Sequence, residues 1–160
     1  INMPAKSKMN KPEYLYIKNN QLGLYKDGEK IVKVIAGKFE NAEGPEKGHN
    51  VEPIYFHVVL EKDKEFKCDV PSGHNSFVYL LAGDLSIGEN KHNKTSNSNL
   101  ILLDRGDKLI VKANKKSEFL FIAGKPIGEP IARGGPFVMN TKAEILEAVQ
   151  DYHNGTFAKY

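Results

Sequence analysis

Apolar and polar residues alternate in short runs along most of the chain, and turn residues separate the runs. Alternation with a period of two is the pattern of a β-strand that buries one face. In residues 54–60 every even-numbered side chain is apolar, whereas the other face carries Tyr55, His57 and Val59. The same reasoning predicts short strands at residues 21–25, 31–36, 54–60, 65–70, 76–81, 84–87, 100–103, 108–113 and 118–123.

Turn residues support this division. Asp27-Gly28 lies between the first two predicted strands and is a strong hairpin signal. Residues 88–99 are rich in Asn, Lys and Ser, too polar for a core, and are predicted to form an exposed, mobile loop. Short strands at this spacing predict an all-β fold, an antiparallel β-sandwich or jelly-roll barrel.

One α-helix is expected, at the C-terminal end. Residues 129–140 are rich in Gly and Pro and are predicted to form a loop with a tight, fixed path. Thr141 and Glu144 then form a capping box, and Asn154-Gly155 is a stop signal. The helix is predicted to dock on a core, with recruitment of a partner as the alternative. Its apolar face comprises Ile145, Val149 and Tyr152.

Composition limits the class of protein. A chain of 160 residues can form one core, and its apolar runs stay well short of the roughly 20 residues of a membrane span. A lone cysteine, Cys68, is read as a packed residue and indicates a reducing, cytoplasmic compartment. The net charge of +3 comes almost wholly from lysine, with Arg105 and Arg133 as the arginines. Direct recognition of nucleic acid is therefore not expected.

Several ordered motifs carry a family resemblance. They are Val34-Ile-Ala-Gly37 with Gly44-Pro45, Pro53-Ile-Tyr55, Val70-Pro-Ser-Gly73-His74-Asn75, Phe77-Val-Tyr79-Leu-Leu-Ala-Gly83, Gly106-Asp107, Phe121-Ile-Ala-Gly124-Lys-Pro126 and the segment from Glu129 to Phe157. In this order they resemble the C-terminal domain of the pirin family, two-domain members of the cupin superfamily. The chain starts at Ile1 without a charged leader, and its first residues resemble the pirin inter-domain linker.

The resemblance implies a division of the chain and a longer protein. Residues 1–19 are expected to be a linker and the remnant of a preceding domain, residues 20–137 a cupin-like domain, and residues 138–160 the helix and tail. The N-terminal metal-binding cupin domain would lie outside this chain. It is the expected partner, and it is expected to hold iron or another divalent metal.

The resemblance also implies that this half has no metal, cofactor or catalytic residues of its own. Tyr79 and Gly83 match the anchor that follows the ligand cluster of metal-binding cupins. Family spacing then places Asp69, Pro71 and Asn75 where two histidines and a glutamate would stand. The strand and turn at residues 109–117 contain no histidine for the third imidazole position.

The histidines present have ordinary interpretations. His74, in a Gly- and Pro-rich turn, is expected to bond to backbone, with a ligand or base as the alternative. His57 is expected at a surface or lining a pocket, and His49, His92 and His153 in solvent. Arg105-Gly106-Asp107 is read as a turn rather than as an adhesion tripeptide.

The first functional hypothesis is a supporting C-terminal domain, silent by itself, of a two-domain iron protein. Pirins are described as transcriptional co-regulators, which would make transcription factors partners and add the nucleus as a location in eukaryotes. Several pirins have quercetin 2,3-dioxygenase activity, so the whole protein is alternatively a metal-dependent oxidoreductase. A further alternative is a small-molecule binding module that uses a barrel interior around Tyr55, His57 and Tyr79.

Overall fold

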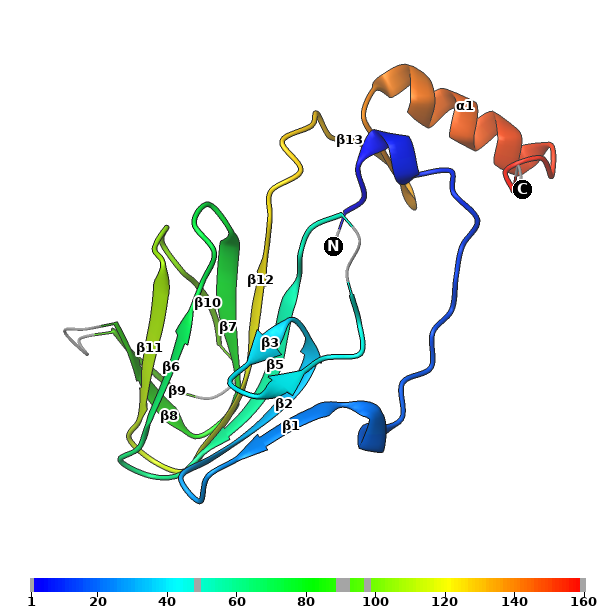
Figure 1. Ribbon diagram of the computed structural model, residues 1–160. Coiled ribbons are helices and arrows are strands. Elements are labelled where there is room, and N and C mark those ends of the chain that lie inside the picture. Colours follow the sequence, from blue (N-terminus) through cyan, green and yellow to red (C-terminus); the bar gives the residue numbers. More distant parts are fainter. Residues whose placement is uncertain (1, 48–49, 89–92, 97–98, 159–160) are drawn as a thin grey trace. The chain divides into compact units, whose positions relative to one another are not determined.

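The computed structural model describes residues 2–47, 50–88, 93–96 and 99–158 (Figure 1). The chain forms two compact units. The larger unit spans Ile17–Pro126, and the smaller unit combines Ile1–Tyr16 with Ile127–Tyr160.

Two antiparallel sheets build the larger unit. A six-stranded sheet has the order β1-β2-β5-β12-β7-β10, and a four-stranded sheet has the order β6-β11-β8-β9. The strands of the first are β1 (Gly23–Lys26), β2 (Lys30–Ala36), β5 (Ile54–Leu60), β12 (Ser117–Gly124), β7 (Asn75–Ala82) and β10 (Leu100–Leu102). Those of the second are β6 (Glu65–Asp69), β11 (Lys108–Ala113), β8 (Asp84–Ile87) and β9 (Asn93–Ser96). A short hairpin of β3 (Lys38–Phe39) and β4 (Ala42–Glu43) follows β2, and a 3-10 turn (Asn19–Gln21) precedes β1.

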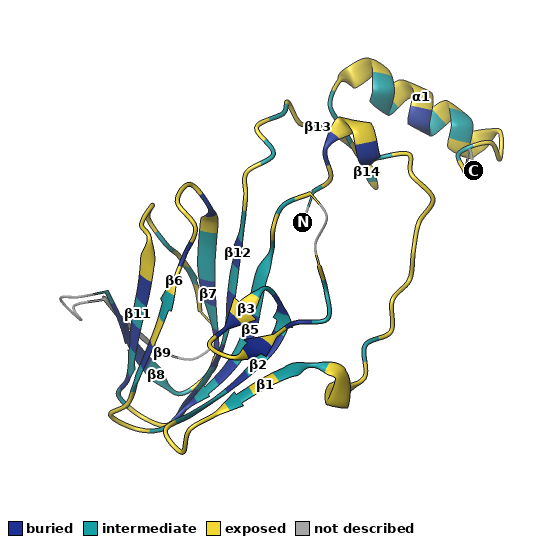
Figure 2. Cartoon of the chain, viewed as in Figure 1, coloured by how far each residue is buried: buried dark blue, intermediate teal, exposed yellow. Residues whose placement is uncertain are grey.

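The inner faces of the two sheets share one hydrophobic core. On β5 the buried side chains are Phe56, Val58 and Leu60, as the alternation predicts. Phe66 of β6 packs edge-on against Phe119 of β12 with their ring centroids 5.7 Å apart, which joins the two sheets. Figure 2 shows the buried residues distributed along the strands. The prediction of an antiparallel β-sandwich is thus confirmed.

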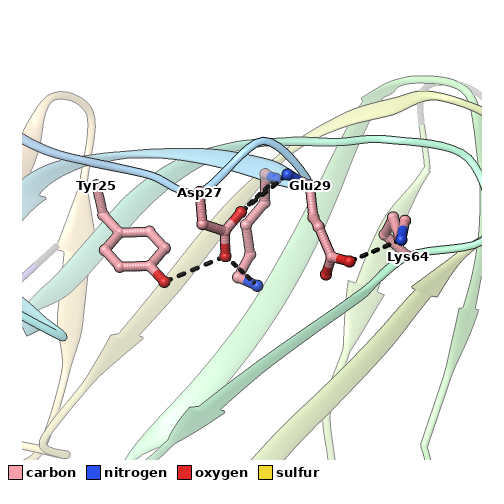
Figure 3. A network of polar contacts seen from close by, with 5 residues as sticks. Tyr25, Asp27, Glu29 and Lys64 are labelled. Carbon is pink, nitrogen blue, oxygen red and sulfur yellow. Dashed lines mark hydrogen bonds and ion pairs between the residues drawn. The ribbon is translucent and has the colours of Figure 1, made fainter.

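The Asp27 carboxylate organises the turn between β1 and β2 (Figure 3). Its Oδ1 atom accepts hydrogen bonds from the backbone N–H groups of Glu29 at 2.9 Å and Lys30 at 3.0 Å. Its Oδ2 atom accepts the Tyr25 hydroxyl at 3.1 Å and pairs with Lys30 Nζ at 2.8 Å. Lys64 Nζ donates to Glu29 Oε1 at 2.6 Å beside it. The predicted hairpin is therefore closed by side-chain bonds to its own backbone.

We expect these contacts to make stability depend on pH. The Lys30 ammonium, followed by the two backbone donors, holds the pKa of Asp27 below its usual range. A depressed carboxyl pKa stabilises the fold above about pH 4, and this contribution is lost as the pH falls. Asp27→Asn should therefore cost about 1 to 2 kcal/mol near neutral pH, a difference that shrinks toward about pH 2. Urea unfolding of both proteins across this range measures it.

Asp104→Asn is the matched control, because Asp104 is exposed and no ion pair or hydrogen bond joins it to another residue that the structure describes. Its effect on the unfolding free energy should be small and nearly independent of pH. A difference for Asp27→Asn that stays constant down to the acid limit would contradict the role given to the carboxylate.

The loop prediction for residues 88–99 is wrong in part. Asn93–Ser96 forms β9, which pairs antiparallel with β8. Strand pairing is made by backbone groups, and polar residues are ordinary in a strand at the edge of a sheet, so composition alone did not reveal it. Residues 89–92 and 97–98 of that segment lie outside the described residues.

The smaller unit contains a hairpin where the sequence predicts only a loop. β13 (Ala132–Gly134) pairs with β14 (Phe137–Met139), and Gly135 in the turn has a φ of 54°. A Cβ on Gly134 would collide with the side chain of Ile145 in the following helix. The glycine thus allows the helix to approach the hairpin closely. A short 3-10 turn (Ala5–Ser7) also belongs to this unit.

The helix α1 (Lys142–His153) has the ends that the sequence predicts. Glu144 N–H donates to Thr141 Oγ1 at 3.2 Å and Thr141 N–H donates to Glu144 Oε2 at 2.7 Å, which is the capping box. At the other end, Gly155 N–H donates to Tyr152 O and Thr156 N–H to Asp151 O, the Schellman arrangement. No helix among the described residues is both long and apolar enough to cross a bilayer.

The helix face departs from the prediction. Ala148 is the buried residue, and Ile145 and Val149 are half-buried. Tyr152 is 65% exposed, although its ring lies 6.0 Å from that of Phe137 in β14. The helix therefore packs on the β13–β14 hairpin of its own unit, with Tyr152 at the margin of the contact.

Candidate functional site

The outer face of the six-stranded sheet is largely apolar. Because side chains alternate along a strand, the residues between the buried ones of β2, β5, β7 and β12 point away from the core. We call this surface the outer apolar face. Its apolar members are Leu24, Ile31, Ile35, Tyr55, Val59, Phe77, Tyr79, Leu100, Leu102, Leu120 and Ile122. Lys33, His57 and Glu118 are polar residues on the same face.

The strand register makes these residues neighbours. Leu120 of β12 lies opposite His57 of β5 on one side and Tyr79 of β7 on the other. Ile122 lies in the same way between Tyr55 and Phe77. At the two edges of the sheet, Leu24 is 60% exposed and Leu102 is 77% exposed. Contiguous apolar surface of this kind on a folded domain marks an interaction site.

The outer face of the four-stranded sheet is different. On β6 it carries Glu65, Lys67 and Asp69, which lie opposite residues of β11. The opposing residues are Lys112, Ile110 and Lys108. Charged residues of opposite sign across a strand pair are typical of a face in water. The apolar character therefore distinguishes one sheet and is not a general property of the surface.

Tyr55, His57 and Tyr79 do not line a barrel interior, and that prediction is wrong. All three lie on the outer side of the six-stranded sheet, because Phe56, Val58 and Leu80 occupy the inner side. His57 Nε2 lies 2.6 Å from Glu118 Oε1, and the His57 side chain is 22% exposed. The surface position expected for His57 is confirmed.

The positions assigned by family spacing to metal ligands do not form a site. The Asp69 side chain is 91% exposed, and Pro71 and Asn75 are exposed as well. On β11 the inward side chains are Leu109, Val111 and Ala113, which offer no donor atom. No group of three His, Cys, Asp or Glu that could hold a metal ion occurs in the described ranges. The residues present do not fit an iron centre; that the isolated chain binds none stays a prediction.

His74 is bonded to backbone, as predicted. The His74 side chain is buried, and its Nε2 lies 3.2 Å from the carbonyl oxygen of Glu52. The backbone N–H of His74 donates to the carbonyl oxygen of Pro71 at 3.1 Å. Glu52 has a φ of 45°, an uncommon conformation for a side-chain-bearing residue. The imidazole thus supports a strained turn, and the Nδ1 atom has no hydrogen-bond partner among the described residues.

The other candidate residues that the structure describes, His153 and Cys68, show no feature of a catalytic or ligand-binding site. His153 is exposed in the last turn of α1, and His49 and His92 lie outside the described residues. Burial, with the nearby Asp69 carboxylate, raises the pKa of the Cys68 thiol to about 12. A thiol that keeps its proton at neutral pH is not a nucleophile, which agrees with Cys68 as a packed residue.

Sequence reasoning missed the outer apolar face, although a signal was present. Residues 77–81 read Phe-Val-Tyr-Leu-Leu and residues 119–123 read Phe-Leu-Phe-Ile-Ala, so both faces of these strands are apolar. Near-continuous apolar strands are typical of a sheet that is covered on both sides. This pattern predicts a second buried face in addition to the core.

The strand order and the single apolar core between two antiparallel sheets define a cupin-type β-sandwich. The sequence description of the Pirin C-terminal cupin domain matches residues 55–158. The chain therefore belongs to the pirin family, as the ordered motifs indicate.

Relatives agree with this assignment. The chain is 32% identical over 158 residues to pirin of Homo sapiens, covering 96% of this chain and 54% of the human protein. It is 33% identical over 159 residues to a pirin-like protein of Caulobacter vibrioides, covering 98% of this chain and 56% of that protein. The crystal structure of quercetin 2,3-dioxygenase from Acinetobacter baumannii superposes with a TM-score of 0.88 at 32% identity, covering 98% of this chain and 55% of the other. The chain thus spans about half the length of the relatives it matches.

Proposed function

We propose that this chain is the supporting C-terminal half of a two-domain pirin-type protein, and that its outer apolar face docks an N-terminal cupin domain. The observation that carries the proposal is the largely apolar outer surface of the six-stranded sheet, where Leu120 and Ile122 lie among aromatic neighbours. An antiparallel sheet that faces water has polar residues on that side, so this face fits a second buried layer.

The length of the relatives supports an N-terminal domain, rather than another partner, as the occupant of the outer apolar face. The human and Caulobacter proteins extend beyond the matched part by close to half of their length. A domain of that size would have a sheet face large enough to cover a six-stranded sheet. The His57–Glu118 pair at 2.6 Å interrupts the apolar surface and would set the orientation of the docked domain, because a buried ion pair needs matching polar groups.

Iron chemistry belongs, in this proposal, to the absent half. This chain supplies no fitting ligand set in its described residues, and its interior is filled by apolar side chains such as Phe56 and Phe121. The chain alone would be catalytically silent and would act by completing and stabilising the whole protein. The likeness to the Acinetobacter quercetin 2,3-dioxygenase supports an oxygen-dependent oxidoreductase as the activity of the whole.

Transcriptional co-regulation is the second candidate function. Its support is membership of the pirin family and the likeness to human pirin. In that role transcription factors would bind the assembled protein, in the cytoplasm or nucleus. The charged outer face of the four-stranded sheet would remain free for such a partner after the outer apolar face is covered.

Metal content tests where the chemistry lies. The chain and a version extended upstream to the natural start are purified from cells grown with iron, and bound metal is measured by inductively coupled plasma mass spectrometry. We expect about one metal ion per molecule in the extended protein and close to none in the chain alone, because imidazole and carboxylate ligands converge only in the former.

Two variants sharpen the result. His57→Gln and His74→Gln in the extended protein should leave the metal content unchanged, since neither imidazole belongs to the expected centre. Tightly bound, near-stoichiometric metal in the 160-residue chain would reject the proposed division of labour.

A further inference from the structure

A cleft of about 710 Å³ opens at one end of the larger unit. It lies between β10, the last strand of the six-stranded sheet, and β11 with the end of β8 in the four-stranded sheet. Pockets that hold small organic ligands have volumes of roughly 300 to 1,000 Å³, so the cleft is large enough for one. The cleft is separate from the apolar core between the sheets. It is also separate from Tyr55 and His57, around which the sequence suggested a small-molecule site.

The floor of the cleft is apolar. Val70, Ile87 and Leu109 line it and are each no more than 7% exposed. Ile101 and Leu103 of the β10 side also line it and pack against the core from their half-buried positions. A floor held in place by core packing is preformed, and it suits a flat apolar or aromatic group.

The rim carries more positive than negative charge. Arg105, Lys108 and Asp104 lie on it, in the connection between β10 and the start of β11. Arg105 has no ion pair or hydrogen bond to any other residue that the structure describes. Lys108 has one partner, Asp69, at the long distance of 4.0 Å. An exposed guanidinium without an ion-pair partner among the described residues can pair with a ligand carboxylate.

We infer that this cleft binds a small amphiphilic carboxylate, with the apolar body on the Val70–Ile87–Leu109 floor and the carboxylate at Arg105. Arg105 and Gly106 of the Arg105-Gly106-Asp107 turn then have a role in lining a small-molecule site. The cleft adjoins the outer apolar face at Leu100 and Leu102, which line both, whereas Arg105 and the Val70–Ile87–Leu109 floor lie outside that face.

Three probes of one shape test the charge preference. Naphthoate is the carboxylate, naphthamide its neutral counterpart and naphthylmethylammonium its cationic counterpart. Binding to the chain is followed by amide chemical shifts in NMR titrations. We expect naphthoate to bind saturably with a Kd of roughly 0.1 to 1 mM and naphthamide about three- to tenfold more weakly. Shifts should centre on Arg105, Lys108 and Gly88, which line the cleft.

Variants test the assigned residue. Arg105→Gln should weaken naphthoate binding about five- to tenfold and leave naphthamide binding unchanged, because it removes only the charge-assisted contact. Arg105→Lys should retain part of the affinity. Arg133→Gln, which removes the other arginine and lies in the smaller unit, is the control and should have no effect.

Any of four outcomes overturns the inference. One is equal binding of naphthoate and its neutral or cationic counterpart. Another is full naphthoate affinity in Arg105→Gln. The third is a set of shifts confined to Leu120, Ile122 and their neighbours, which would place the probe on the outer apolar face. Absence of any saturable shift up to several millimolar naphthoate rejects it as well, at about ten times the expected Kd.

Discussion

Replacement of Gly83 by alanine is expected to lower the free energy of unfolding by about 3 to 5 kcal/mol, a large part of the stability of a single domain. Gly83 joins β7 to β8 with a φ of 103°. A Cβ there would collide with Ser117 Oγ and lie 2.6 Å from Ser117 Cα and 2.7 Å from the carbonyl oxygen of Lys116. Two of these three neighbours are backbone atoms, which cannot rotate away.

The neighbouring hydrogen bonds would be disturbed as well. The Asp84 N–H donates to Ser117 Oγ at 3.0 Å, and the same hydroxyl donates to the carbonyl oxygen of Lys115 at 2.7 Å. Ser117 is buried, so a lost partner cannot be replaced by water without rearrangement. Urea unfolding monitored by circular dichroism measures the effect.

Gly28→Ala is the control that separates the cost of a positive φ from the cost of the steric collision expected in Gly83→Ala. Gly28 has a φ of 83°, yet a Cβ there would meet nothing within 4 Å. It should cost about 1 to 2 kcal/mol, the price of the left-handed conformation alone. If Gly83→Ala and Gly28→Ala unfold at the same urea concentration, the close approach of Gly83 to Ser117 is not what requires glycine.

Leu120→Glu is expected to weaken association with the N-terminal cupin domain at least about 100-fold. Leu120 is central to the outer apolar face, with His57 and Tyr79 on either side. A carboxylate introduced there would be buried in the complex on the same face as Glu118, which already pairs with His57, and burying this second negative charge is strongly unfavourable. The two halves are produced separately, and isothermal titration calorimetry gives the Kd of each pair.

Lys67→Glu is the control, since it changes charge on the outer face of the other sheet. It should leave the Kd within about twofold of the parent. Both variants should keep the unfolding free energy of the isolated chain within about 1 kcal/mol, so a weaker association cannot be attributed to misfolding. Equal weakening by both variants, or no association of the parent halves, would contradict the docking proposal.

Local patterns predicted the secondary structure well where local forces decide it. The alternation in residues 54–60 predicts both the strand and its buried side, and Phe56, Val58 and Leu60 are fully enclosed. Thr141 and Glu144 bond within one turn of chain, so their capping box is readable without tertiary information. β9 and the β13–β14 hairpin were missed, because they depend on backbone pairing rather than on the type of side chain.

The all-β class, the helix ends and membership of the pirin family can be predicted from the sequence, since period, caps and ordered motifs are local properties of the chain. That Tyr79 lies outside the core follows from the three-dimensional fold, because β7 is apolar on both faces and its sequence does not reveal which face meets the second sheet. The cleft beside Arg105 likewise exists only because β10 and β11, which are consecutive in the chain, belong to different sheets.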